Sequence, residues 1–286
     1  MIKFIAEVSS NHNQDLKRSF EFIDAAASSG CKAVKFQLFK IEKLFAPEIL
    51  KKSIKHRERK NWELPIEFIP KLSERCKSHN IEFSCTPFYL DAVHELEPYV
   101  DFYKIASYEL LWDDLLVKCA RTEKPVIIST GMANILEIQH AVKVLKDNGC
   151  ENPIILHCTS AYPTPFFEAN LKAINSIRLA TDCEVGWSDH TVEPGVIHRA
   201  IHKWDVKVVE FHLDLDGIGD EFKTGHCWLP NQIGKLITDV NKAYGADGNG
   251  VKEPTKSEYP DREWRADPED GLRPFKSIRN DWKTDE

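Results

Sequence analysis

The sequence predicts an α/β fold, a TIM (β/α)8 barrel with a short irregular C-terminal tail. Eight apolar segments alternate with segments of helical spacing over residues 2–245. Continuous apolar runs are typical of parallel strands that are buried on both faces. Eight βα units fit one barrel, for which roughly 250 residues is typical. A doubly wound sheet is the alternative, but it would need a glycine-rich turn after the first strand, where the chain has Ser9-Ser10-Asn11-His12.

Each predicted strand is a short apolar run rich in strand formers that ends at polar residues or at a turn. The first run contains Phe4, Ile5 and Val8, is interrupted by Glu7, and stops at Ser9. The predicted strands cover residues 2–8, 33–38, 81–85, 102–105, 125–128, 153–158, 183–187 and 206–209.

Helical spacing of apolar residues appears between the strands. In the first helical segment Phe20, Phe22, Ile23 and Ala26 show this spacing, and Gly30 follows as a stop signal. The predicted helices cover residues 15–29, 65–79, 134–148, 170–179 and 231–244. Residues 51–60 include six lysines and arginines and are predicted to form a long basic loop.

Composition narrows the class of protein. The net charge of −7 does not favour nucleic-acid binding, and no apolar run approaches membrane-spanning length. The N-terminal apolar segment is too short for a signal peptide. Eight cysteines without a CxxC pair are typical of reduced, buried thiols. We expect a cytoplasmic protein without nucleic-acid or membrane partners, with the barrel at residues 1–250 and the tail at residues 251–286.

Two histidines lie at the ends of two consecutive strands. His190 follows the predicted strand 183–187, and His212 follows the predicted strand 206–209. Imidazole is a good ligand for Mn, Fe, Co or Zn, and two such residues can share one ion. The alternative is a pair of unrelated loop or core histidines. The residues at the ends of the other strands favour the metal site.

Polar side chains gather at the C-terminal ends of the predicted strands, which form the active-site face of a TIM barrel. The set comprises Glu7, Lys35, Gln37, Thr86, Lys104, Ser107, Ser129, Tyr162, Ser188, His190, Glu210 and His212. Taken singly, Lys35 could be a lysine at the edge of the structure, Ser129 a helix cap, and Glu210 a partner of a lysine. Lysines and glutamates are seldom buried without partners, so one common mouth is the better interpretation.

The chemistry of this mouth suits a multiply charged anion. Two lysines supply point charges that suit phosphate, and serine and threonine hydroxyls add directional hydrogen bonds. A metal held by the histidines can act as a Lewis acid on a carbonyl, and Glu7 is a candidate general acid or base. These residues predict metal-assisted chemistry between a phosphorylated anion and a carbonyl or sugar.

The chain resembles the sialic acid synthases, the N-acetylneuraminate synthase family, over residues 2–245. The resemblance rests on short motifs that occur in one order along the chain. They are Ile5-Ala6-Glu7 with Asn11-His12, Val34-Lys35-Phe36-Gln37, Thr86-Pro87-Phe88, Tyr103-Lys104-Ile105 with Ser107, Ser129-Thr130-Gly131-Met132-Ala133, His157-Cys158-Thr159-Ser160 with Tyr162-Pro163-Thr164-Pro165, Ser188-Asp189-His190-Thr191, and Glu210 with His212.

The resemblance implies a synthase that condenses phosphoenolpyruvate with an N-acylated amino sugar, similar to N-acetylmannosamine, to give a nonulosonic acid and phosphate. It implies two histidine ligands of a divalent metal, usually Mn, with Mg, Co or Zn as alternatives, and a homodimer. The resemblance implies acid/base chemistry for Glu7, with Glu210 near the metal, and metal ligation for His190 and His212. The residues implied in phosphoenolpyruvate binding are Lys35, Thr86, Lys104, Ser107, Ser129 and Ser188. The residues implied in sugar contacts are Gln37, Tyr162 and Asn11.

The chain departs from the family pattern in its first loop at Ser9 and Ser10, at Trp187 and Phe211, and in residues 217–228. The family places an acidic sugar contact in this last loop, and here Asp220 or Glu221 could serve.

The segment after residue 250 is too short for the antifreeze-like domain of many family members. We expect an irregular tail that packs on its own barrel through two tryptophans. The alternative is a tail that brings Arg265 or Arg273 to a barrel mouth, its own or that of a dimer partner. A related 2-keto-3-deoxy sugar acid synthase and a catalytically silent sugar-phosphate-binding barrel remain as alternative functions.

Overall fold

The computed structural model describes residues 2–283 and contains a parallel barrel, as the sequence predicts. The strands follow the spatial order β3-β2-β1-β8-β7-β6-β5-β4, and a parallel bridge between Ser84 and Phe102 joins β3 to β4 and closes the ring. The strands are β1 Lys3–Glu7, β2 Ala33–Leu38, β3 Glu82–Pro87, β4 Tyr103–Ile105, β5 Val126–Ser129, β6 Ile154–His157, β7 Val185–Asp189 and β8 Val208–Leu213.

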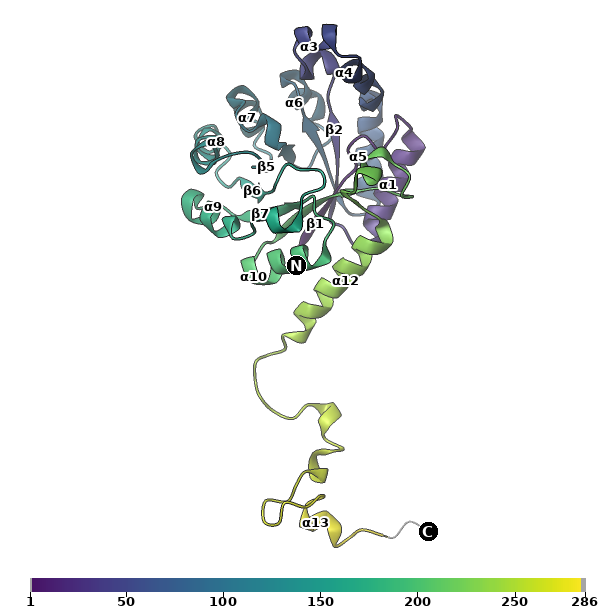
Figure 1. Ribbon diagram of the computed structural model, residues 1–286, viewed down its shortest axis with the longest axis vertical. Coiled ribbons are helices and arrows are strands. Elements are labelled where there is room, and N and C mark those ends of the chain that lie inside the picture. Colours follow the sequence, from purple (N-terminus) through teal and green to yellow (C-terminus); the bar gives the residue numbers. More distant parts are fainter. Residues whose placement is uncertain (1, 284–286) are drawn as a thin grey trace. The chain divides into compact units, whose positions relative to one another are not determined.

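Helices surround the strands (Figure 1). The helices that follow β1 to β8 are α1 Leu16–Ser28, α5 Ile69–Ser78, α6 Leu90–Leu96, α7 Asp113–Ala120, α8 Ile135–Asp147, α9 Ala173–Thr181, α10 Pro194–Trp204 and α12 Pro230–Ala246. Side-chain caps help to begin two of them: Asp15 accepts hydrogen bonds from the first turn of α1, and Asn134 forms a capping box with Glu137 at α8. The structure contains a helix at each of the five predicted segments, with ends shifted by a few residues, so these predictions are confirmed.

Inward side chains of the barrel change character along the strands. A small apolar cluster lies at one level, formed by Ile5, Ala33, Phe102, Ile127, Leu156 and Val208. Two residues further along their strands stand Glu7, Lys35, Lys104, Ser129 and Glu210, because side chains alternate between the two faces of a strand. The outward residues pack against the helices in a much larger apolar core. The polar level at the C-terminal ends thus rests on an apolar floor.

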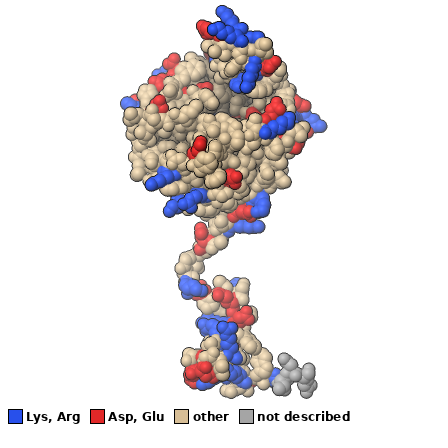
Figure 2. Space-filling view, viewed as in Figure 1, with Lys and Arg blue, Asp and Glu red and all other residues tan. Residues whose placement is uncertain are grey.

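Two sequence expectations are wrong in detail. Residues 51–60 do not form a long loop but belong to α3 Pro47–Lys52, α4 Ile54–Glu58 and the 3-10 helix η1 Arg59–Trp62. Pro47 begins α3 at a position where its missing N–H costs nothing, and the Ser53 hydroxyl accepts from the backbone N–H of His56 at the start of α4. Their lysines and arginines gather on the surface at the top of Figure 2.

The seventh and eighth strands run further than predicted. β7 includes Ser188 and Asp189, and β8 includes Glu210 and His212. The sequence interpretation ended these strands at their first polar residues. In a barrel, however, a polar inward residue can alternate with an outward apolar one, as Ser188 does with Trp187, so polarity alone does not end a strand.

Residues 214–229, between β8 and α12, form a structured segment that is named the excursion. It contains the short helix α11 Asp220–Thr224 and the two-residue strand β9 Cys227–Trp228. β9 runs parallel to the end of β8, with His212 opposite Cys227 and Leu213 opposite Trp228.

A second compact unit begins at Lys242, and the first unit ends at Asn241. Within residues 242–283 the elements are the end of α12, the 3-10 helices η5 Lys256–Glu258 and η6 Arg262–Trp264, and the helix α13 Lys276–Arg279. Trp264 and Trp282 contact each other edge to face, with ring centroids 5.0 Å apart. The roles foreseen for Arg265 and Arg273 stay predictions.

Among the helices of residues 2–283, none combines the length and apolar composition that crossing a lipid bilayer needs.

Candidate active site

Two lysines and two glutamates form a buried charge cluster inside the barrel mouth. Lys35 forms an ion pair with Glu7, and its ammonium nitrogen lies 3.9 Å from Glu210 Oε2. Lys104 Nζ lies 3.7 Å from Glu210 Oε1. Four different strands supply these side chains, and each residue is at most 5% exposed. Because buried charges need partners, the four residues stabilise one another.

Hydroxyl groups complete the cluster. Lys104 Nζ donates to Ser129 Oγ at 2.6 Å, and Lys35 Nζ donates to Thr86 Oγ1 at 3.3 Å. Ser188 Oγ donates to Glu210 Oε1 at 3.0 Å. Thr86, Ser129 and Ser188 are three of the four hydroxyl residues predicted to bind the anion, and the structure brings these three to the two lysines and Glu210.

The electrostatic environments of the two lysines differ. Burial lowers the pKa of Lys35, but the carboxylates of Glu7 and Glu210 outweigh it and leave this pKa above its ordinary value. Burial lowers the pKa of Lys104 below its ordinary value, because Glu210 only partly opposes it and Lys35 adds to it. Burial raises the pKa of Glu210, yet the two ammonium groups hold it below its ordinary value. Lys35 is therefore the more firmly charged lysine.

A second group of hydroxyls lies beside this cluster. Ser107 Oγ accepts from the backbone N–H of Gly131 at 3.0 Å and lies 3.3 Å from Cys158 Sγ. A Cβ atom on Gly131 would fall 2.0 Å from Ser160 Oγ, so a side chain at this position would force the Ser160 hydroxyl to move. Ser160 Oγ is buried without a hydrogen-bond partner in the protein. Ser160 belongs to the sequence motif after the sixth predicted strand, but no site role was predicted for it.

The ring of His190 is fixed by its environment. Its Nδ1 lies 2.8 Å from the carbonyl oxygen of Thr159, which can only accept, so Nδ1 carries the proton and Nε2 carries the lone pair. Burial, with a smaller contribution from His212, lowers the pKa of His190 to about 3. The imidazole is thus neutral at neutral pH, the form that binds metal. The His190 and His212 ring centroids are 5.4 Å apart.

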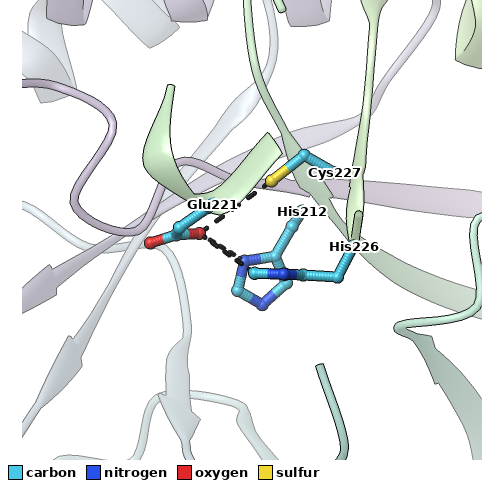
Figure 3. Close-up of side chains that lie close together, drawn as sticks. All are labelled: His212, Glu221, His226 and Cys227. Carbon is cyan, nitrogen blue, oxygen red and sulfur yellow. Dashed lines mark hydrogen bonds and ion pairs between the residues drawn. The ribbon is translucent and has the colours of Figure 1, made fainter. Parts of the chain in front are cut away.

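Four potential metal ligands, one of which is His212, lie close together. Figure 3 shows His212, Glu221, His226 and Cys227, which each offer one donor atom within 4.8 Å of the others. Glu221 Oε2 lies 3.0 Å from His212 Nδ1 and 3.5 Å from His226 Nε2. Of the two acidic candidates in this loop, the structure therefore brings Glu221 to the site, whereas the Asp220 side chain is 89% exposed.

His226 and Cys227 were missed as site residues. No ordinary strand or helix pattern marks them in the sequence, since β9 has only two residues. The weak signal was a histidine and a cysteine side by side in the stretch that departs from the family pattern.

The three predicted sugar contacts occupy different environments. The Gln37 amide donates to Glu7 Oε1. The Tyr162 ring lies 4.3 Å from the His190 ring and 5.1 Å from the His226 ring, centroid to centroid. The Asn11 amide is buried and donates to the Leu213 carbonyl at 3.0 Å, which orders the backbone beside β9. Gln37 and Tyr162 therefore border the site, and the sugar role of all three stays a prediction.

Asp189 links the two histidine-bearing segments. Its buried carboxylate accepts from both tryptophan indoles, Trp187 Nε1 at 3.1 Å and Trp228 Nε1 at 3.0 Å. It also accepts from Thr191 Oγ1 at 2.7 Å and from the backbone N–H groups of Thr191 and Val192. One carboxylate thus holds the turn that carries His190 and the strand that follows His226.

A cleft of about 560 Å³ opens beside the mouth, between the loops after β5 and β6. Its lining includes Thr130, Met132, Cys158, Thr159 and Ser160. It reaches the second hydroxyl group through Ser160, which places open volume next to the buried charge cluster.

Glu109 provides a test of the burial around this mouth. Its Oε2 is buried without a partner, and burial raises its pKa to about 7 against a weaker opposing effect of Lys104. In the unfolded chain the same carboxyl loses its proton near pH 4.3, so the folded state binds the extra proton between these values. The free energy of unfolding should therefore fall by about 3 kcal/mol between about pH 4.5 and pH 8 through this group.

We expect Glu109→Gln to remove most of that decline, measured by urea unfolding at several pH values. The exposed residue Glu168 supplies the control, since Glu168→Gln should leave the pH dependence unchanged. A Glu109→Gln profile that follows the wild-type decline over this range contradicts the expectation.

Comparison with known proteins gives a consistent set of relatives. A family model described as the NeuB family matches residues 22–252. N,N'-diacetyllegionaminic acid synthase of Campylobacter jejuni is 37% identical over 270 residues, covering 89% of this chain and 80% of that protein. The protein of the same name from Legionella pneumophila is 32% identical over 273 residues, with 90% and 76% covered.

Solved structures agree with these relatives. The N-acetylneuraminic acid synthetase of Leptospira borgpetersenii superposes with a TM-score of 0.79 at 30% identity, covering 92% of this chain and 91% of that one. A truncated 3-deoxy-D-arabino-heptulosonate 7-phosphate synthase of Thermotoga maritima shares the fold, with a TM-score of 0.65 at 14% identity.

Proposed function

The chain belongs to the NeuB family, and from this premise we propose that it condenses phosphoenolpyruvate with an N-acylated amino sugar. The products are a nonulosonic, sialic-acid-like acid and phosphate. The relatives named above are legionaminic acid synthases and a sialic acid synthetase, which supports this class of reaction. The observation that carries the proposal is the buried pair of lysines, held beside hydroxyls and imidazoles at one barrel mouth.

The charges of the buried cluster support the binding of an anion together with a metal cation. The positive charges of Lys35 and Lys104 are matched by the negative charges of Glu7 and Glu210, so the cluster has no net charge. A phosphoenolpyruvate anion would make a closed, buried site strongly negative. A divalent ion offsets part of this charge, and the neutral imidazole of His190 with its free Nε2 lone pair suits such an ion.

In this proposal the anion is bound by the lysines and their hydroxyls. Lys35 and Lys104 contact its phosphate and carboxylate, and Thr86, Ser129 and Ser188 add hydrogen bonds. Ser107 and the unpartnered hydroxyl of Ser160 lie where further oxygens of the same anion can bind. The protein thereby holds the enol carbon in a fixed position, which lowers the entropic part of the barrier.

The amino sugar binds in its open aldehyde form above the anion. His190 and His212 would hold a divalent ion, which would supply Lewis-acid polarisation of the aldehyde. The methylene carbon of phosphoenolpyruvate forms the new bond to the aldehyde carbon as the aldehyde C=O π bond breaks. The aldehyde oxygen takes up a proton and becomes a hydroxyl, and the phosphate-bearing carbon becomes a cation. Water then adds to the resulting cation, and loss of phosphate leaves the keto group.

Glu7 is placed for the proton transfers of this reaction. Its two oxygens face the ammonium of Lys35 and the amide of Gln37, so the carboxylate is oriented inside the mouth. It takes the proton of the attacking water. Glu210 bridges the two lysines and, in this proposal, contacts the sugar close to the metal.

We propose that the enzyme works in the cytoplasm as a homodimer. The eight cysteines are free and buried, which is typical of a reducing compartment. The dimer comes from the family resemblance, and sedimentation of the purified protein tests it.

A phosphate-release assay tests the proposed function. We expect phosphate from phosphoenolpyruvate only when a suitable N-acylated aldose is added, with a keto acid formed in equal amount. A panel of N-acetylated and N,N'-diacetylated aldoses should identify the acceptor. Chelation should abolish turnover and Mn²⁺ should restore it. The proposal is wrong if no acceptor in the panel supports phosphate release by folded, metal-loaded protein, or if the His190→Ala, His212→Ala double variant keeps full activity.

A further inference from the structure

The excursion between β8 and α12 brings additional ligand atoms to His212. Because β9 pairs in parallel with the end of β8, Cys227 lies opposite His212, and His226 comes directly before it. The helix α11 places Glu221 in the same space (Figure 3). The His226 ring centroid is 4.9 Å from that of His212 and 5.1 Å from that of Tyr162.

The spacing of the donor atoms suits one ion. Ligands about 2.1 Å from a metal lie about 3.0 Å apart at a right angle and about 3.4 Å apart at a tetrahedral angle. The observed separations are 3.0 Å from Glu221 Oε2 to His212 Nδ1 and 3.5 Å from Glu221 Oε2 to His226 Nε2.

The outer atoms of these groups are held by other residues. Ser10 Oγ donates to Glu221 Oε1 at 2.9 Å, which leaves Oε2 to face the imidazoles. The Thr224 hydroxyl lies 2.8 Å from His226 Nδ1, which leaves Nε2 toward Glu221. Metal ligands are commonly oriented by such partners of their outer atoms.

We propose that Glu221 and His226 are ligands of the metal, in addition to His190 and His212. His212, Glu221 and His226 then supply two imidazoles and one carboxylate, and the other positions of a six-coordinate ion remain for His190, substrate or water. The carboxylate also reduces the positive charge that the ion presents to the mouth. The inference shares its metal with the proposed function, but metal binding can be measured without any substrate.

The Cys227 thiol lies at the edge of this site. Its Sγ is 4.0 Å from Glu221 Oε2 and is the softest donor in the group. The Cys227 thiol is therefore tested separately, by the substitution Cys227→Ser.

The test is a titration of the full-length apoprotein with Co²⁺, which reports both affinity and coordination through its visible spectrum. We expect Glu221→Gln and His226→Gln each to weaken Co²⁺ binding at least about tenfold and to change the spectrum. Asp220→Asn on the same helix and His94→Gln on an exposed surface are the matched controls, and both should bind Co²⁺ as the wild type does. Wild-type affinity and spectrum in both ligand variants overturn the proposal.

A second pair of variants covers the case in which a ligand variant fails to fold. In the Cys227→Ser background, His226→Cys offers a thiolate at the proposed ligand position. We expect a sulfur-to-cobalt charge-transfer band in the double variant that Cys227→Ser alone lacks. No such band in a folded double variant counts against ligation at residue 226. Protein that binds Co²⁺ through these ligands but releases no phosphate contradicts the proposed function and leaves this inference intact.

Discussion

Replacing Lys104 by methionine is expected to raise the KM for phosphoenolpyruvate about 100-fold while changing the KM for the sugar little. Methionine keeps an unbranched apolar stem in the same buried space and removes the ammonium group. The loss includes a charge-assisted hydrogen bond to the anion, worth about 1.5–3 kcal/mol. It also leaves Glu210 with Lys35 alone, at 3.9 Å, so the mouth becomes net negative and repels the anion.

Lys35→Met should act in the same direction. Lys43→Met, at an exposed lysine that follows β2, is the control and should leave both KM values unchanged. Steady-state kinetics with each substrate varied in turn separates the two effects, and thermal unfolding checks that each variant is folded. If phosphoenolpyruvate saturates both folded variants at wild-type concentrations, the two lysines do not bind it.

Gly186→Ala is expected to destabilise the barrel by about 3 kcal/mol, at the upper end of the usual cost of overpacking. Gly186 lies inside the barrel on β7, and a Cβ atom there would fall 2.4 Å from the carbonyl oxygen of Val208 and 2.7 Å from Leu156 Cδ2. The carbonyl belongs to the neighbouring strand β8, so it cannot move aside without shifting the sheet.

Urea unfolding with matched m-values measures this cost. Gly195→Ala is the control, because Gly195 lies in α10 and a Cβ atom there meets nothing within 4 Å. That variant should be neutral or more stable by up to about 1 kcal/mol, since alanine favours a helix over glycine. Equal stability of the two variants would show that β7 and β8 can separate slightly at no cost.

The barrel was predictable because its signal repeats. Eight apolar runs, each ending in polar residues, specify parallel strands whose C-terminal ends meet, and Glu7, Lys35, Lys104 and Glu210 follow from position alone. The partners within the cluster were not predictable. That Glu210 contacts both lysines depends on the stagger of neighbouring strands around the barrel, which no single strand encodes.

Shorter elements gave too little pattern to interpret. The helices of four to six residues between residues 41 and 58 are shorter than two turns, so apolar periodicity could not distinguish them from a basic loop. Because β9 is also too short for a periodic pattern, it was not predicted, and His226 and Cys227 were not recognised as site residues. A two-residue strand has no alternation, and its position is fixed by distant residues, among them Asp189 through Trp228.

The pairing of β9 with β8 has a consequence for the cost of binding. A free loop from Asp214 to Leu229 would lose about 1–2 kcal/mol of backbone conformational entropy for each residue that a ligand had to order. Here the excursion is already ordered by the β9 ladder, by the indole of Trp228 on Asp189, and by the amide of Asn11 on Leu213. Glu221 and His226 therefore occupy their positions before any ion or substrate arrives, and the binding energy is not consumed in ordering the loop.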